Sequence, residues 1–127
     1  MENQRDDKGV KMIKNIDNFS FTPLPVGVGG SMSVLISSDD APHFAMRKFI
    51  IKKEGNVPLH TNSVEHEQYV LKGSAKVVIG EEQTVAKKDD VLFIPAGVPH
   101  SYEVVGDEDY EFLCLVPNLE DKMEIIS

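Results

Sequence analysis

Three histidines occupy positions that suit a metal centre. His60 and His66 flank the short segment TNSVE, and His100 follows in a later segment. Neutral imidazoles are good ligands for Mn, Fe, Zn and Ni, and three of them leave coordination positions open for water or substrate. Asn62 is two residues from His60, so on a strand both side chains face the same way. The spacing predicts a site for one divalent transition metal, although three unrelated surface histidines would also satisfy it.

Side-chain parity along the neighbouring segments adds candidate substrate-binding residues. Gln68 shares a strand face with His66, and Tyr102 shares one with His100. An inward polar group beside a metal site needs a hydrogen-bond partner, which makes Gln68 the strongest of these candidates. The full set of substrate-binding candidates is Arg47, Gln68, Tyr102, Phe112 and Cys114. No residue is assigned a catalytic role.

Several candidates also have a purely structural interpretation. Arg47 could reach solvent from the end of its strand, and Cys114 could be a small buried hydrophobic residue. Phe112 could serve only in packing. Glu65 and Glu67 have the opposite parity to the histidine between them, so they should face outward unless the strand register shifts by one residue.

Short apolar runs separated by turn signals must position these residues. Strand-forming residues at this spacing, bounded by Gly, Pro and Asp, indicate an all-β sandwich or barrel. KEGNVP, at 53–58, is expected to be a turn, and TPLPVGVGG, at 22–30, a loop or irregular edge. Only 118–126 allows a helical turn. The expected strands are SMSVLIS, FAMRKFIIK, EHEQYVLK, AKVVIG, TVAK, VLFIP, HSYEVV and YEFLCLVP.

Length and composition limit the possible functions. The 127 residues suit one domain, with a frayed or disordered segment at 1–18 and a barrel domain at 19–127. A formal charge of −8 without a Lys/Arg-rich block argues against nucleic acid and anionic membranes as partners. A single cysteine excludes an internal disulfide and favours a reducing compartment. The polar first twenty residues lack a secretory h-region, so we expect a cytoplasmic protein.

Two segments resemble the sequence motifs of the cupin superfamily, in particular those of small prokaryotic metal-binding cupins of the type-2 conserved barrel kind. GNVPLHTNSVEHEQYVLKG resembles the first motif, which has a glycine, His-x-His, a third ligand and a closing glycine. VLFIPAGVPHSY resembles the second motif, Pro-x-Gly-x-x-His. The likeness covers about residues 39–117. The matching positions are Gly55, His60, His66, Gly73, Pro95, Gly97 and His100.

The sequence departs from these motifs at three positions. Asp89 replaces a glycine and Val104 an asparagine, and both affect only turn or packing positions. Asn62 replaces the second histidine, and a carboxamide oxygen is a weaker ligand for transition metals than imidazole. Asn62 could coordinate weakly, hydrogen-bond a metal-bound water, or leave the fourth position vacant. A cupin that has lost its metal is the alternative.

The resemblance implies an all-β cupin double-stranded β-helix, or jelly-roll barrel, in a single domain. It also implies one divalent transition metal (Mn, Fe, Zn or Ni), a small-molecule substrate or ligand, and a homodimer. The function expected first is that of a metal-dependent, dioxygenase-like oxidoreductase acting on a small chelating substrate. A fold hosts many activities, so a non-redox isomerase or lyase and a non-catalytic small-molecule-binding cupin remain alternatives.

Overall fold

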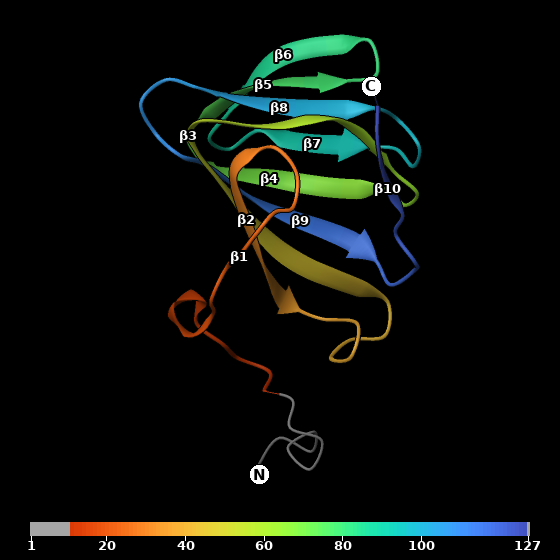
Figure 1. The fold of residues 1–127 in the computed structure, drawn as a ribbon. Helices are drawn as coiled ribbons and strands as arrows, with labels where there is room; N and C mark the ends of the chain where they lie inside the picture. Colours follow the sequence, from red (N-terminus) through yellow and green to blue (C-terminus); the bar gives the residue numbers. More distant parts are fainter. Residues whose placement is uncertain (1–10, 127) are drawn as a thin grey trace.

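The computed structural model describes residues 11–126, whose regular secondary structure is almost entirely β-strand (Figure 1). Part of the expected frayed segment, residues 1–10, lies outside the described residues. Residues 11–18 include a 3₁₀ helix at Ile16–Asn18, and the ammonium of Lys14 pairs with the carboxylate of Asp40 at 3.1 Å. No helix within 11–126 has the length and apolar composition of a membrane span.

Each apolar run that the sequence indicates forms a strand. In β4, β8 and β9 alternate side chains are buried, as expected for strands with one face on a core. The strands are β1 (Thr22–Pro23), β2 (Val28–Ile36), β3 (Phe44–Asn62), β4 (His66–Lys72), β5 (Ser74–Ile79), β6 (Glu82–Lys87), β7 (Val91–Ile94), β8 (His100–Val105), β9 (Tyr110–Pro117) and β10 (Met123–Ile125).

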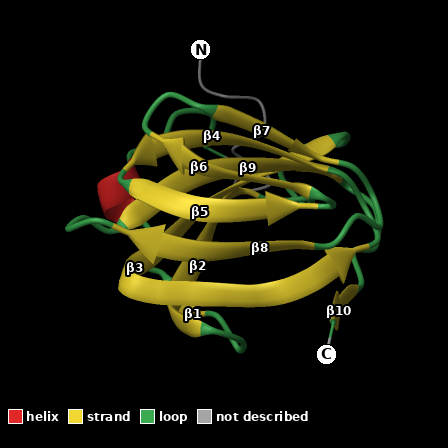
Figure 2. Cartoon of the chain, turned by 90° about the horizontal axis from the view of Figure 1, so that it is seen from above, coloured by secondary structure: helices red, strands yellow, loops and turns green. Residues whose placement is uncertain are grey.

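The described strands form one curled antiparallel sheet. Its main path runs β6-β5-β8-β3-β9-β4-β7, while β2 and β10 pair with β3 off this path. Figure 2 shows the curl, with β5 and β8 on one side of the interior and β4, β7 and β9 on the other. This is the predicted jelly-roll barrel. Its core lies between the two layers and includes the fully buried Ile51, Val70, Tyr110 and Phe112.

Strand β3 joins the two layers, and here the predicted turn at 53–58 is wrong. Its first part pairs with β2 and β9, and its last part pairs with β8. Between them the chain bends without leaving the sheet, because Glu54 takes a φ of 68° and Gly55 lies against the carbonyl of Val28. A Cβ at position 55 would overlap that carbonyl oxygen. The turn-forming residues therefore produce an irregularity within a long strand.

The helical turn that the sequence allows at 118–126 is also not formed. Instead β10 adds to β3, with Met123 opposite Asn62 and Ile125 opposite His60. Pairing with an existing strand satisfies backbone groups that one isolated helical turn would leave without partners. The segment 22–30 is irregular as expected, apart from the two-residue β1 and the start of β2.

We predict that Gly73→Ala destabilises the protein more than Gly106→Ala. Both glycines have a left-handed φ, 79° and 82°, so either alanine should cost about 1–2 kcal/mol. Only at Gly73 would the new Cβ also overlap the carbonyl oxygen of Asp109, and nothing lies within 4 Å of a Cβ at Gly106. The free energies of unfolding can be compared by urea denaturation. Equal values for the two variants would show that the backbone at Gly73 relaxes freely.

Candidate metal centre and substrate cavity

Three strands bring the predicted ligands to one end of the barrel. His60 and Asn62 end β3, His66 begins β4, and His100 begins β8 directly opposite His60. The ring centroids of His60 and His100 are 4.1 Å apart, and those of His66 and His100 are 6.2 Å apart. All four residues are buried, with exposed fractions of 5%, 8%, 5% and 1% in chain order. The antiparallel register thus assembles residues that are far apart in the sequence.

Two of the imidazoles are fixed by backbone carbonyls. His60 Nδ1 lies 2.8 Å from the oxygen of Pro58, and His100 Nδ1 lies 3.0 Å from the oxygen of Val98. A carbonyl oxygen only accepts hydrogen bonds, so Nδ1 must carry the proton of each neutral ring. The Nε2 atoms are left with free lone pairs. A hydrogen bond from Nδ1 to a carbonyl oxygen is typical of histidines that bind metals through Nε2.

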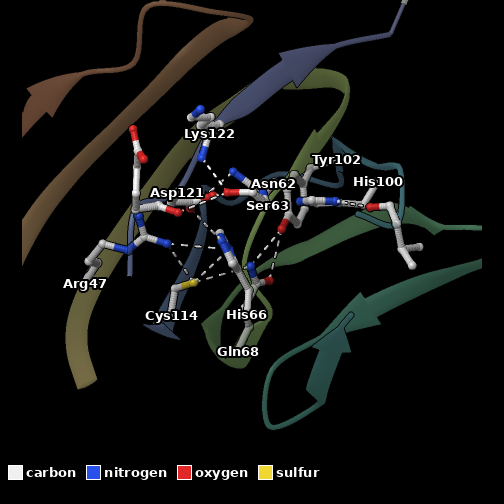
Figure 3. Close-up of polar contacts among 12 residues, drawn as sticks. Arg47, Asn62, Ser63, His66, Gln68, His100, Tyr102, Cys114, Asp121 and Lys122 are labelled. Carbon is white, nitrogen blue, oxygen red and sulfur yellow. Dashed lines mark hydrogen bonds and ion pairs between the residues drawn. The ribbon is translucent and has the colours of Figure 1, made fainter. Parts of the chain in front are cut away.

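His66 is held differently (Figure 3). Its Nε2 lies 3.1 Å from Asp121 Oδ2, while its Nδ1 lies 3.4 Å from Cys114 Sγ and 3.5 Å from a terminal nitrogen of Arg47. Because a carboxylate accepts, Nε2 carries the proton when the ring is neutral. As the side chains stand, no group of three or more His, Cys, Asp or Glu residues within 11–126 is arranged to hold a metal.

Asn62 supplies the strongest structural sign that the site suits a metal or a ligand. Its Nδ2 donates to Asp121 Oδ2 at 3.4 Å, but its Oδ1 is buried without a hydrogen-bond partner. Buried acceptors in proteins are nearly always satisfied, so this oxygen is suited to an external partner. Together with two free imidazole nitrogens it fits a divalent transition metal. His66 would join these donors by giving up its hydrogen bond to Asp121.

Burial favours the neutral imidazole at His66 and at His100. Desolvation lowers the pKa of His100 to about 4. The pKa of His66 is also lowered, first by burial and then by the nearby guanidinium of Arg47. Burial raises the pKa of Cys114 and of Tyr102, so both remain protonated at neutral pH. Neutral imidazoles are the form that binds metal.

The histidines face a cavity of about 280 Å³. Four of the predicted substrate-binding residues, Arg47, Gln68, Tyr102 and Phe112, line it. Cys114 is fully buried behind this wall, where its sulfur contacts Arg47 and Gln68 at 3.3 and 3.7 Å. The apolar part of the wall is made by Leu24, Pro25, Val26, Met32, Phe49, Ile51, Val57, Phe112 and Met123.

The polar wall residues are partly engaged with one another. Gln68 and Tyr102 form a closed pair, with Gln68 Nε2 donating at 2.8 Å and the Tyr102 hydroxyl donating back to Gln68 Oε1 at 3.1 Å. Arg47 lies over the ring of Phe49 at 5.2 Å and forms no ion pair with a described residue. Its buried Nε also lacks a hydrogen-bond partner. Of the two interpretations that the sequence leaves open for Arg47, the structure places its side chain on the cavity wall, and its role in binding a substrate stays a prediction.

Glu65 and Glu67 lie away from the cavity, and the charged residue Asp121, which lines it, was not predicted. Glu65 and Glu67 do not line it, and Glu67 has its pKa raised by a hydrogen bond with Glu65. Their predicted outward orientation is confirmed. Asp121, which contacts His66 and Asn62, follows no recognisable motif. The only sequence signal near it is the three-residue alternation Met123–Ile125, which is too short to predict a strand.

Sequence comparison establishes the family. Residues 47–116 match the family model of the cupin domain, so the chain belongs to the cupin family. The match includes the three histidines, Asn62 and all of the predicted substrate-binding residues. Asp121 and β10 lie beyond its end. None of the curated proteins compared with the chain matches it.

Solved structures of similar fold include an enzyme and two further cupin-like proteins. The polyketide cyclase RemF from Streptomyces resistomycificus has a TM-score of 0.81 and 24% identity, over 91% of this chain and 87% of its own. A cupin-2 domain protein from Rhodospirillum rubrum has a TM-score of 0.81 and 20% identity, over 93% and 82%. A predicted oxalate decarboxylase from Thermotoga maritima has a TM-score of 0.75 and 23% identity, over 85% and 100%. Because all three identities are below 25%, the similarity establishes the fold alone.

We predict that the metal-free protein loses stability as the pH falls from about 6.5 to about 4. The pKa of His100 is about 4 in the folded protein but about 6.5 in an unfolded chain, so the unfolded state binds more protons in this range. The contribution of His100 to the free energy of unfolding is fully present above pH 6.5. Its loss between pH 6.5 and 4 is on the order of 3 kcal/mol. Urea denaturation at several pH values, with a chelator present, measures it.

The His100→Gln variant should show a shallower pH dependence than the parent protein over this range. His43→Gln, at an exposed position, is the matched control and should keep the parent's slope. The explanation fails if His100→Gln and the parent lose stability equally between pH 6.5 and 4.

Proposed function

We propose that this cupin is a metal-dependent enzyme acting on a small compound with an apolar body and one chelating or anionic end. The observation that supports this most directly is the convergence of three buried imidazoles and the unpartnered Asn62 Oδ1 on one cavity. Residues His60, His66 and His100 would hold one Mn, Fe, Zn or Ni ion, with a fourth position near Asn62. When bound, the ion would supply Lewis-acid or redox chemistry.

The polar groups left free in the cavity indicate the class of substrate. The guanidinium of Arg47 has no carboxylate partner among the described residues, so it is available to an anionic oxygen. Asn62 Oδ1 is available to a hydroxyl donor. The remaining wall is mostly apolar and keeps water away from the reacting group. A diketone, enol, phenol or thiol of modest size satisfies these requirements.

The first reaction class is dioxygenase-like oxidation of such a compound. A dry, mostly apolar wall beside neutral imidazole donors suits the binding of oxygen next to an organic substrate. In this reaction Arg47 would hold the anionic end of the substrate, while Phe49 and Phe112, stacked 5.0 Å apart, would position its apolar part. Oxygen uptake by metal-loaded protein, screened against diketones, enols, thiols and phenols, tests this class.

The second reaction class is non-redox, namely an isomerase or lyase reaction. The position of Arg47 favours it, because a guanidinium stabilises negative charge that develops on a carbonyl oxygen. The similarity in fold to a polyketide cyclase and to a predicted oxalate decarboxylase is compatible with this class. Conversion of the same compounds without oxygen uptake would identify it. Tight binding of a compound without conversion would instead indicate a non-catalytic binding protein.

A homodimer in the cytoplasm completes the proposal. Support for the dimer comes from large apolar side chains exposed on the outer face of β4, β7 and β9. Tyr69, Val91, Phe93 and Leu115 all belong to this group. Exposed apolar groups that adjoin one another on a sheet commonly mark a protein interface. The cytoplasmic location rests on the single cysteine, which favours a reducing compartment.

We predict that protein purified without a histidine tag carries close to one transition-metal ion per chain. The double variant His60→Ala/His66→Ala should lose it, because two of the three imidazoles are removed. His43→Ala, which changes an exposed histidine, is the control and should keep the metal. Elemental analysis measures the content. Protein that is metal-free and also refuses added Mn, Fe, Zn, Ni and Co would refute the metal site.

We predict that Arg47→Ala raises KM for the substrate about 10-fold or more, since a hydrogen bond to a charged group contributes about 1.5–3 kcal/mol. The metal content should change much less, because Arg47 is not among the expected ligands. Arg47→Lys keeps the charge and should recover part of the loss. Steady-state kinetics and elemental analysis of the same preparations separate the two effects. A variant that loses metal but keeps KM would contradict this role for Arg47.

A further inference from the structure

We infer that Asp121 is itself a ligand of the metal and fills the position left open by the replacement of a histidine at position 62. This inference rests on the proposed metal site. It differs from the motif-based ligand set because Asp121 lies beyond the matched cupin segment, in the chain that leads into β10.

The backbone around Asp121 fixes its carboxylate at the site. Strand β10 pairs with the ligand-bearing end of β3, which brings the preceding residues over the histidines. Ser63 holds this turn, because its N–H donates to Asp121 Oδ1 at 3.1 Å and its hydroxyl accepts from the N–H of Lys122 at 2.7 Å. With Oδ1 held in this way, Oδ2 is the oxygen that lies against His66 and Asn62 (Figure 3).

The distance between Asp121 Oδ2 and His66 Nε2, 3.1 Å, suits two ligands of one ion. Ligands that each lie about 2.0–2.2 Å from a metal and subtend a right angle are about 3.0 Å apart. The two atoms can therefore bind one ion with little movement of either side chain. The required change is that the His66 proton passes from Nε2 to Nδ1. Nδ1 would then donate to Cys114 Sγ at 3.4 Å and give up the hydrogen bond that it accepts from the Arg47 guanidinium at 3.5 Å.

Asn62 then acts on Asp121 instead of replacing the missing histidine. Its Nδ2 donates to Oδ2 at 3.4 Å, and a carboxylate oxygen has a second lone pair for the metal. Asn62 Oδ1 has no protein partner, and the residue is 8% exposed, so this oxygen stays available for a metal-bound water or a substrate hydroxyl. Two residues thus take over from the histidine that the motif has at this position: Asp121 binds the metal, and Asn62 donates a hydrogen bond to Asp121.

A carboxylate changes the chemistry of the site as well as its geometry. It adds one negative charge to three neutral imidazoles, which strengthens binding of a dication. Carboxylate oxygens also suit Mn better than an all-imidazole set does. The inference therefore predicts that Mn binding depends on Asp121.

The first experiment compares the affinities of Mn and Co for the full chain and for Asp121→Asn. This substitution preserves the size of the side chain and removes its charge. We expect the affinity to fall by about 100-fold or more. Loss of a group that only hydrogen-bonds a ligand typically costs about 10–100-fold. Glu120→Gln, which removes the charge of the adjacent exposed residue, is the matched control and should bind like the parent. Thermal melting with a chelator checks that each variant folds.

The second experiment asks whether residue 121 touches the metal. Asp121→Cys places a thiolate donor at this position, and thiolate ligation of Co gives a near-ultraviolet charge-transfer absorption. The parent protein contains Cys114 alone, so its Co spectrum is the baseline. We expect the new absorption in Asp121→Cys, and we expect it to disappear in Asp121→Ser.

The outcomes separate this inference from the proposed function. A parent protein that binds metal while Asp121→Asn binds it equally well, or more tightly, would overturn the inference and leave the metal site standing. Tighter binding would show that Asp121 competes with the metal for His66. Absence of the charge-transfer absorption in Co-loaded Asp121→Cys would also overturn direct ligation. A parent protein that binds no metal at all would refute both proposals.

Discussion

The hydrogen bonding of β3 to strands in both layers of the barrel is the constraint on which the rest of the structure depends. Its first part belongs with β2 and β9, and its last part belongs with β8 and β10. A strand shared in this way must bend, and the bend at Glu54 and Gly55 turns its end over the interior. His60 and Asn62 stand at that end. The cavity exists where it does because this strand crosses from one layer to the other.

Burial then determines the chemistry available at this end of the barrel. Imidazoles removed from water lose their tendency to bind a proton, which is why the pKa of His100 falls to about 4. Backbone carbonyls fix the tautomers of His60 and His100, while Asp121 and Cys114 surround His66 with partners of a different kind. Two of the imidazoles are thus held rigidly. The third can exchange a hydrogen bond for a metal bond by moving one proton.

The cavity combines a mostly apolar wall with a few polar atoms that have no hydrogen-bond partner. Buried polar atoms without partners cost free energy, so their presence on a cavity wall indicates a ligand that supplies the missing bonds. Arg47 Nε and Asn62 Oδ1 are such atoms, one a donor and one an acceptor. Gln68 and Tyr102, by contrast, satisfy each other. In the proposed function Arg47 and Asn62 would therefore bind the polar groups of the substrate, while Gln68 and Tyr102 would support the wall.

The strands from β2 to β9 could be predicted from sequence because each is a short apolar run with its own turn signals. The parity of Arg47 and Gln68 could be predicted as well, since alternation along a strand is a local property. The role of KEGNVP was misjudged, because the same turn-forming residues can end a strand or bend it, and only the partners of β3 decide between these. Alternation alone does not identify the cavity wall, because Val70 has the same parity as Gln68 but is fully buried and does not line the cavity.

The sequence by itself determined the fold class and the three histidines, since both are written in local patterns of spacing and polarity. Only the tertiary structure decided what surrounds those histidines. Asp121 reaches His66 across 55 positions of the chain, by way of the pairing of β10 with β3. Nothing local at 118–126 signals that pairing. A three-residue strand is too short for its alternation to be recognised, and its backbone groups are satisfied by the partner strand. Contacts between distant segments are set by the closure of the barrel, which no single segment encodes.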